Sequence, residues 1–94
     1  MAAIGILTLE IRLEHAHSLK DKRQVVRSLK DRLRRHNIAI AEIDFQDLWQ
    51  RALLAAVTVS ADRNQAELVL QAAENEAAAV LGPCLVGANL EWLE

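Results

Sequence analysis

Cysteine, proline and glycine are scarce in this chain of 94 residues, which contains one cysteine, one proline and three glycines. The single cysteine, Cys84, excludes an internal disulfide and is typical of proteins from reducing compartments, so we expect a cytoplasmic protein. The glycines stand far apart, at positions 5, 82 and 87. This spacing excludes the glycine-rich loop that cradles phosphate groups in nucleotide-binding proteins, and we expect no cofactor.

Aromatic residues and long apolar runs are also rare. The chain has three aromatic residues, yet 52% of it is hydrophobic, so the core must be aliphatic and rich in alanine. The N-terminal apolar segment meets Glu10 and Arg12 after about eight residues, which is too soon for a secretion signal or for the ~20 apolar residues of a membrane span. We therefore expect neither a signal peptide nor a membrane partner.

The charged residues are distributed unevenly along the chain. Residues 1–36 carry nine basic and four acidic side chains, a net charge of +5, whereas residues 37–94 carry two basic and nine acidic side chains, a net charge of −7. Eight of the eleven Lys and Arg residues lie between Ser18 and Arg35. This polarity favours one face that meets a polyanion or an acidic partner. The length itself predicts one domain spanning residues 1–94.

The first half of the chain predicts a strand and then a helix. From Gly5 to Leu13 apolar residues occupy every second position, and this period of two is typical of a strand. Ser18 can cap the next segment and Asp21 suits the positive end of a helix, so a helix starts here and ends at His36 and Asn37. Its predicted apolar face consists of Leu19, Val26, Leu29 and Leu33.

The second half predicts two strands, a helix and a last strand. The strands are Ile38–Asp44, which is short and β-branched, and Ala52–Ser60, which is apolar on both sides, as in a central strand. Asp62 opens a helix that Gly82 and Pro83 end, and residues 84–93 form the last strand. The predicted buried stripe of this helix consists of Ala66, Val69, Leu70, Ala73, Ala77, Val80 and Leu81.

This element order predicts an α+β, ferredoxin-like βαββαβ sandwich. Two βαβ units with right-handed crossovers form a four-stranded antiparallel sheet with both helices on one face. The first and third strands are then central, and the second and fourth lie at the edges. The other face of the sheet remains open.

Three segments resemble one protein family. These are SLKDKRQVVRSLKDRLR after the first strand, AEIDFQDLWQRA between the second and third strands, and the terminal LEWL. Together they are similar to the YlxP-like family of small bacterial proteins, a domain of unknown function. Phe45 departs from the polar or imidazole side chain expected there in many relatives, and the alanine-rich second helix departs as well. The resemblance implies a ferredoxin-like fold, a cytoplasmic bacterial protein and a loose association with translation and ribosome maturation, but no catalytic residues.

The predicted first helix carries a basic stripe beside its apolar face. Its members recur at spacings of three and four residues, and phosphates can lie along such a row: Lys20, Arg23, Arg27, Lys30 and Arg34. We expect the partner to be ribosomal RNA, a ribosomal subunit or an acidic protein. The alternative is a solvated helix face, partly neutralised by Asp21 and Asp31. The predicted central strands lack rings on which bases stack, so RNA would be bound by charge and shape.

The connection between the second and third strands is a second candidate site. It is either a docking loop or a segment whose role is structural. Its candidate residues are Asp44, Gln46, Asp47, Trp49 and Arg51. As architecture, Asp47 makes an Asx turn, Trp49 covers the end of the hairpin and Arg51 pairs with a carboxylate. As a docking loop, it presents Trp49 and Arg51, whose side-chain types dominate binding hot spots. Two carboxylates in this loop are the only basis for a catalytic reading.

No metal site or catalytic residue is predicted. His15 and His17 stand close together, but neither a cysteine nor a third histidine accompanies them. Cys84 follows a proline at a strand start and is interpreted as a small buried side chain.

The open sheet face leads to a second functional hypothesis. We expect it to expose Ile4 and Ile6, with Ala52, Leu54 and Ala56 on whichever face of their strand points away from the helices. Because monomers rarely expose a large apolar patch, two copies can bury these faces in a homodimer. The sequence therefore favours a non-enzymatic accessory factor of translation or ribosome maturation that contacts RNA backbone or an acidic partner through its basic helix. The alternative is a dimeric regulatory or small-ligand-binding module.

Overall fold

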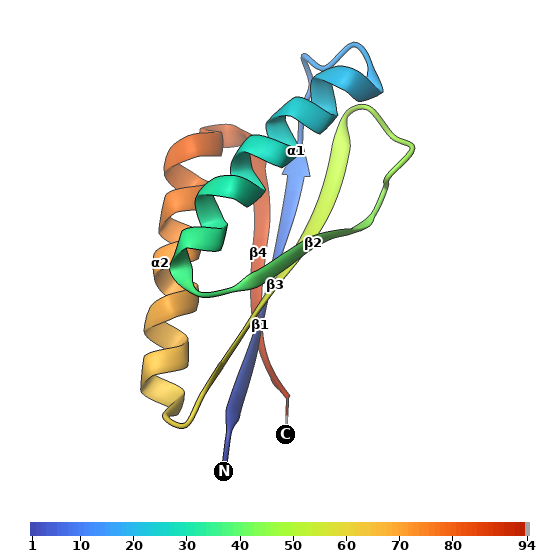
Figure 1. The fold of residues 1–94 in the computed structure, drawn as a ribbon. Coiled ribbons are helices and arrows are strands. Elements are labelled where there is room, and N and C mark those ends of the chain that lie inside the picture. Colours follow the sequence, from blue (N-terminus) through green and yellow to red (C-terminus); the bar gives the residue numbers. More distant parts are fainter. Residues whose placement is uncertain (94) are drawn as a thin grey trace.

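The computed structural model describes residues 1–93, which form a four-stranded antiparallel sheet and two α-helices. The elements follow the chain in the order β1 (Ala3–Arg12), α1 (Leu19–Leu33), β2 (Ala39–Asp44), β3 (Arg51–Ser60), α2 (Arg63–Leu81) and β4 (Leu85–Leu93). The strand order is β2-β3-β1-β4, and both helices cover the same face of the sheet (Figure 1). The predicted ferredoxin-like fold is confirmed, with the first and third strands central. Glu94, the last residue of the predicted domain, lies outside the described residues.

The core lies between the helices and one face of the sheet. The register between β1 and β3 pairs Leu9 with Leu54, and their neighbours on the same face are buried too. The other strand residues of this layer are Leu7, Ile11, Ala52 and Ala56. The expectation that Ala52, Leu54 and Ala56 lie on the open face is therefore wrong. They pair with the helix-facing residues of β1, so they face the helices.

The open face of the sheet is nevertheless apolar, as expected for Ile4 and Ile6. Ile4 pairs with Val59 and Ile6 pairs with Val57, and none of these four residues faces the core. The β3 residues that replace the expected set are therefore the intervening ones: Leu53, Ala55, Val57 and Val59. Among them Val59 is 59% exposed.

Helix α1 starts at the predicted cap. Ser18 Oγ accepts a hydrogen bond from Asp21 N at 3.1 Å, and Asp21 Oδ2 accepts one from His17 N at 3.0 Å, so two free backbone amides are satisfied reciprocally. The α-helix ends at Leu33 and continues as a 3₁₀ turn over Arg34–His36. Asn37 then takes a left-handed conformation, with φ of 61°. This side chain tolerates that conformation better than most, which ends the helix as predicted.

Helix α2 packs closely on the sheet because small residues line its inner face. Ala66, Ala73 and Ala77 are fully buried, together with Leu70 and Leu81. The expected burial of Val80 is wrong, since this side chain is 41% exposed beyond the stripe. A Cβ atom added to Gly5 of β1 would lie 2.6 Å from Leu70 Cδ1, so this glycine permits the close approach of α2.

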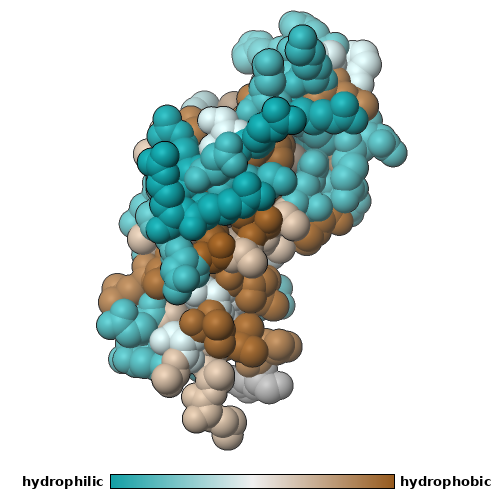
Figure 2. Space-filling model, in the orientation of Figure 1, coloured by the Kyte–Doolittle hydropathy of each residue, from teal (hydrophilic) through white to brown (hydrophobic). Residues whose placement is uncertain are grey.

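The molecule is elongated, with principal extents of 45 × 22 × 19 Å. The start of α1 and the loop between β2 and β3 lie together at one end, although the sequence separates them by more than twenty residues (Figure 1). Figure 2 shows hydrophilic surface over α1 and more hydrophobic surface lower in the view, where the strands extend beyond this helix. Among residues 1–93, no helix is both long and apolar enough to span a membrane.

Candidate functional site

A groove beside α1 brings together four of the five residues of the predicted stripe. It has a volume of about 380 Å³ and is open to solvent on the side of β2. Its lining consists of Val26, Asp31, Glu42 and the four cations Arg23, Arg27, Lys30 and Arg34. We call this surface the basic groove. Three of the cations share one side of α1 and Arg34 continues the row in the following 3₁₀ turn, because spacings of three and four residues return each side chain to nearly the same direction around the helix.

Two carboxylates in the groove are already paired. Asp31 Oδ1 lies 3.1 Å from Arg34 Nη1, and both side chains are more than half exposed. Glu42 pairs with Lys22, which is buried. Within residues 1–93, Arg23, Arg27 and Lys30 have no ion-pair partner. The basic groove therefore presents positive charge that no carboxylate of the described chain neutralises.

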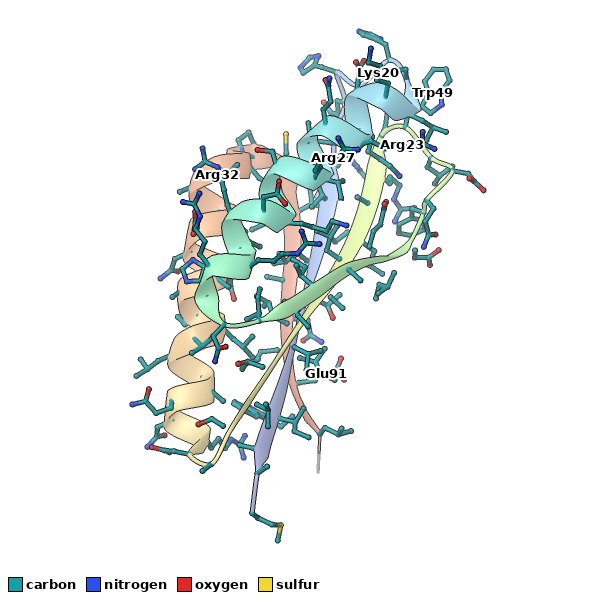
Figure 3. All side chains as sticks on the ribbon, in the orientation of Figure 1. Lys20, Arg23, Arg27, Arg32, Trp49 and Glu91 are labelled. Atoms are coloured by element: carbon teal, nitrogen blue, oxygen red, sulfur yellow. The ribbon has the colours of Figure 1, made fainter. Side chains whose placement is uncertain are left out.

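The fifth member of the stripe lies outside the groove. Lys20 is exposed at the start of α1, where Figure 3 shows it at the same end of the molecule as Arg23 and Trp49. Arg32 belongs to the same helix, but Figure 3 shows it on the side toward α2. Four cations thus lie along the groove side of the helix, whereas Arg32 lies on another side.

Lys22 is buried beneath the loop between β2 and β3, with only 1% of its surface exposed. Its Nζ donates to the backbone oxygens of Phe45 at 2.6 Å, Gln46 at 3.2 Å and Arg51 at 3.2 Å. An ammonium group has three protons, and three carbonyls accept them. Glu42 Oε2 lies 2.9 Å from the same nitrogen. It accepts no directed hydrogen bond from residues 1–93, so this contact is an ion pair.

Phe45 turns its carbonyl toward Lys22 by adopting an unusual backbone conformation. Its φ is 64°, in the left-handed region that an aromatic residue seldom adopts. Asp44 Oδ1 accepts a hydrogen bond from Phe45 N at 2.8 Å, and the guanidinium of Arg51 lies 4.0 Å from the centre of the Phe45 ring. These contacts stabilise the turn. Asn or Asp would adopt this left-handed position more readily than an aromatic residue.

The remaining loop residues divide between structural contacts and exposure. Arg51 Nη2 donates to Glu10 Oε1 at 3.1 Å, as the architectural reading predicts. Gln46 Nε2 reaches the carbonyl of Glu42 at 3.4 Å. The expected Asx turn of Asp47 is not formed, since its side chain accepts no hydrogen bond from the described residues. Asp44 is the loop carboxylate that accepts a backbone hydrogen bond, from the amide of the next residue, Phe45.

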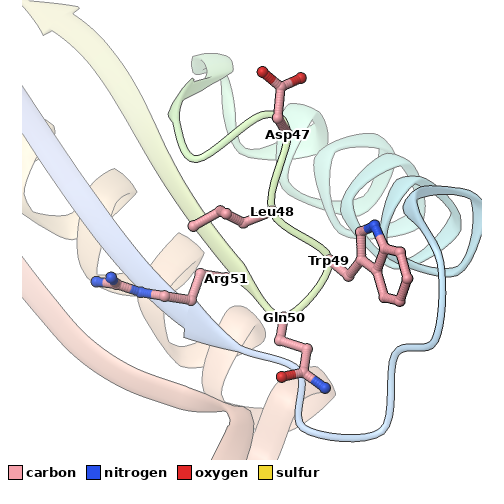
Figure 4. Close-up of a pocket in the computed structure, with 5 residues that line it drawn as sticks. All are labelled: Asp47, Leu48, Trp49, Gln50 and Arg51. Carbon is pink, nitrogen blue, oxygen red and sulfur yellow. The ribbon is translucent and has the colours of Figure 1, made fainter.

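Trp49 is 51% exposed and lies beside a shallow pocket of about 540 Å³ formed by residues 47–51. Figure 4 shows its indole extending from the loop on the side opposite Leu48 and Arg51. Gln50 anchors the next position, because its backbone oxygen accepts from Leu13 N at 2.9 Å and its Nε2 donates to Glu14 O at 3.2 Å. The loop is therefore held at its base and exposes an aromatic ring.

Metal-ligating side chains do not gather within the described residues. No group of three or more His, Cys, Asp or Glu side chains that could hold an ion is present among residues 1–93. His36 contacts Glu76 of α2 instead, with Nε2 and Oε1 separated by 2.5 Å. This contact joins the end of α1 to α2.

Lys22 is the residue that the sequence interpretation missed. Lys22 belongs neither to the predicted basic stripe nor to the predicted apolar face of the first helix, whereas the structure places it inside the core. The sequence contains a signal for this burial. Positions 22, 26, 29 and 33 recur at spacings of four, three and four residues, which places them on one face of a helix. Its charge concealed this periodicity.

Residues 4–87 match a family described as a protein of unknown function, DUF503. The chain belongs to this family. A relative, the uncharacterized protein YlxP of Bacillus subtilis (strain 168), is 39% identical over 69 residues, which cover 72% of this chain and 75% of that protein. The predicted membership of a YlxP-like family is thus confirmed.

Solved structures support the same fold for this DUF503 chain. The designed protein Foldit4 aligns with a TM-score of 0.63 and 6% identity, covering 100% of this chain and 98% of the other. The designed protein LFR1 1 with ferredoxin fold aligns with a TM-score of 0.51 and 14% identity, covering 99% and 84%. At such low identity these similarities establish the fold alone.

Proposed function

We propose that this protein is a non-enzymatic accessory factor of translation or ribosome maturation that binds the phosphate backbone of ribosomal RNA in the basic groove. The observation that carries the proposal is the set of three unpaired cations, Arg23, Arg27 and Lys30, along one side of a rigid helix. Phosphates attract such a row without any base being read, because binding releases condensed counterions from the nucleic acid.

The charge of the rest of the chain supports an approach of RNA to the basic groove. Residues 37–94 have a net charge of −7, so the remainder of the molecule repels a polyanion. RNA would therefore approach through α1 and the adjacent end of the molecule. An acidic protein segment is the competing partner for the same surface.

Salt dependence of binding to purified bacterial ribosomal subunits tests the proposal. With about three phosphate contacts, log K should fall with log salt concentration with a slope of roughly −2 to −3. Arg27→Gln should reduce the magnitude of that slope by about 1. Arg32→Gln removes the same charge from the same helix on the other side and should leave the slope unchanged.

Two results would contradict the RNA proposal. One is an affinity that does not change with salt concentration. The other is an equal loss of affinity in Arg27→Gln and in Arg32→Gln. Cosedimentation from a bacterial lysate, with and without ribonuclease, separates an RNA partner from a protein partner. An acidic protein would remain bound after ribonuclease treatment.

The open sheet face favours a second candidate function, a homodimer that holds a small regulatory ligand between two sheets. The specific observation is that Val59 and Leu93 are each 59% exposed on a face that also carries Ile4 and Ile6. Such a patch is stabilised when a second copy covers it. Sedimentation equilibrium should then give a dimer that Val59→Lys converts to a monomer, and a monomeric parent protein would exclude this candidate.

A further inference from the structure

The exposed ring of Trp49 lies where the proposed RNA path leaves the basic groove. Figure 3 shows Trp49, Lys20 and Arg23 at the same end of the molecule. Glu42 connects the two surfaces, because it lines the groove and contacts Lys22, whose ammonium group binds the carbonyls at the base of the Trp49 loop. Trp49 therefore lies at the same end of the molecule as Lys20 and Arg23, and buried Lys22 couples its loop to the groove residue Glu42.

The loop presents this ring in a defined position. On one side of Trp49, Lys22 holds the backbone of Phe45 and Gln46. On the other side, Gln50 is bonded to the segment between β1 and α1 at Leu13 and Glu14. Because folding has already ordered this backbone, a ligand that stacks on the indole loses little further conformational entropy from the loop.

The indole of Trp49 is half exposed on this ordered loop. The neighbouring Leu48 is also 46% exposed but points to the opposite side of the loop, so the indole is presented by itself (Figure 4). Proteins that bind single-stranded nucleic acid combine these two elements, a positive groove that follows the backbone and an aromatic ring on which a base stacks. Bases inside a duplex are stacked on each other and cannot reach such a ring.

We infer that Trp49 stacks on an unpaired base of an RNA strand whose phosphates lie in the basic groove. This inference rests on the proposed function and adds a substrate class to it, because it predicts a preference for single-stranded or looped RNA over duplex RNA. It also supplies the aromatic contact that the sheet lacks. The ring comes from a loop, so one base is contacted without its sequence being read.

The experiment compares four probes of similar charge: a single-stranded oligoadenylate, an RNA duplex of equal phosphate number, inorganic polyphosphate, which has no bases, and polyglutamate, which is an acidic polypeptide. In NMR spectra of the unmodified protein the indole N–H signal of Trp49, assigned by its loss in Trp49→Phe, should shift strongly with oligoadenylate only. The signal of Trp92, which is stacked against Arg63, serves as the internal reference.

Substitutions give the quantitative arm of the test. Trp49→Ala should weaken oligoadenylate binding roughly 5- to 150-fold, the range of one base–aromatic stack, and leave duplex and polyphosphate affinities and the salt slope unchanged. Trp49→Phe keeps a ring and should recover most of the loss. Should Trp49→Ala fail to fold, the NMR shift and the Trp49→Phe affinities still decide the question.

The outcomes separate this inference from the function on which it rests. If oligoadenylate, duplex and polyphosphate bind equally and Trp49→Ala changes none of them, the stacking inference is wrong and the basic groove stands. If the parent protein binds no probe, or Arg27→Gln has no effect on any of them, both are wrong. A shift of the Trp49 signal by polyglutamate as large as that by oligoadenylate would assign this surface to an acidic protein instead.

Discussion

Lys22 of α1 and Glu42 of β2 form an ion pair of 2.9 Å beneath the only loop of residues 1–93 that exposes a tryptophan. The lysine is buried, while the carboxylate is 17% exposed and faces the basic groove. Because the same ammonium group also binds three backbone carbonyls, it joins helix, strand and loop at one point. This arrangement explains how a loop without glycine or proline keeps a defined shape.

Replacing Lys22 should therefore be costly. Lys22→Met leaves Glu42 without its partner and three carbonyls without donors, and we expect a loss of about 3–5 kcal/mol in the free energy of unfolding, measured by urea denaturation. Glu42→Gln in the same chain should restore part of this loss, since the isolated charge is then removed. Lys20→Met, two residues away on the surface, should change stability by about 0.5 kcal/mol or less. Equal effects of the two lysine substitutions would show that Lys22 is not buried in solution.

Gly5 should not tolerate a side chain. In Gly5→Ala the new methyl group would lie 2.6 Å from Leu70 Cδ1 and 3.1 Å from the Trp92 ring, so the Leu70 side chain, the helix that carries it or the ring must shift. We expect a loss of about 1–3 kcal/mol by thermal or chemical unfolding, as for other overpacked cores. Gly87→Ala of β4 is the matched control, because its nearest atoms, on Glu10, are at least 3.5 Å away. A Gly5→Ala protein as stable as Gly87→Ala would contradict the close packing of α2 on β1.

Asn37 should prefer replacement by glycine to replacement by alanine. Its φ of 61° costs a residue with a Cβ atom roughly 1–2 kcal/mol, whereas glycine adopts it freely. Asn37→Ala should lower the melting temperature, and Asn37→Gly should leave it unchanged or raise it slightly. The carbonyl of Asn37 accepts a hydrogen bond from Thr58 Oγ1 at 3.0 Å, and both variants keep this backbone group. The reverse order of melting temperatures would exclude the left-handed turn.

Removing Asp31 should strengthen RNA binding. Asp31 pairs with Arg34 at 3.1 Å inside the basic groove, so Asp31→Asn frees this guanidinium for a phosphate. We expect a several-fold higher affinity and a salt slope steeper by about 1, measured by fluorescence anisotropy with labelled RNA. Glu67→Gln changes the net charge by the same amount on an exposed position of α2 and should have little effect. If both substitutions raise the affinity equally, net charge and not the groove controls binding.

Much of the fold could be predicted from short-range patterns. Ser18 and Asp62 cap the helices that follow them, and Gly82 ends α2, because caps depend on residues close in the sequence. The order of elements then leaves few topologies, and the predicted central strands are those observed. The face of β3 that meets the helices could not be predicted in the same way. Ala52 to Ser60 is apolar at almost every position, so only the register with β1 distinguishes Leu54 from Leu53.

The sequence predicts the row of cations in the candidate site, but it does not predict the contacts of Lys22 beside that row. Arg23, Arg27, Lys30 and Arg34 share a side of one helix, and helical periodicity alone places them there. The partners of Lys22 lie twenty or more residues away, at Glu42, Phe45 and Arg51, and no local pattern connects them. Lys22 reaches these partners only because α1 packs on the sheet beside β2.

The chain's own residues therefore specify two capped helices, four strands and a cationic stripe, because these features arise from neighbours within a few positions. Tertiary structure decides that Lys22 is buried while Lys20 is exposed, and that Trp49 lies near the end of the basic groove. The physical reason is that burial and long-range hydrogen bonds depend on which surfaces meet when the helices pack on the sheet. Lys22 lies inside that interface and joins β2, through Glu42, to the loop that exposes Trp49.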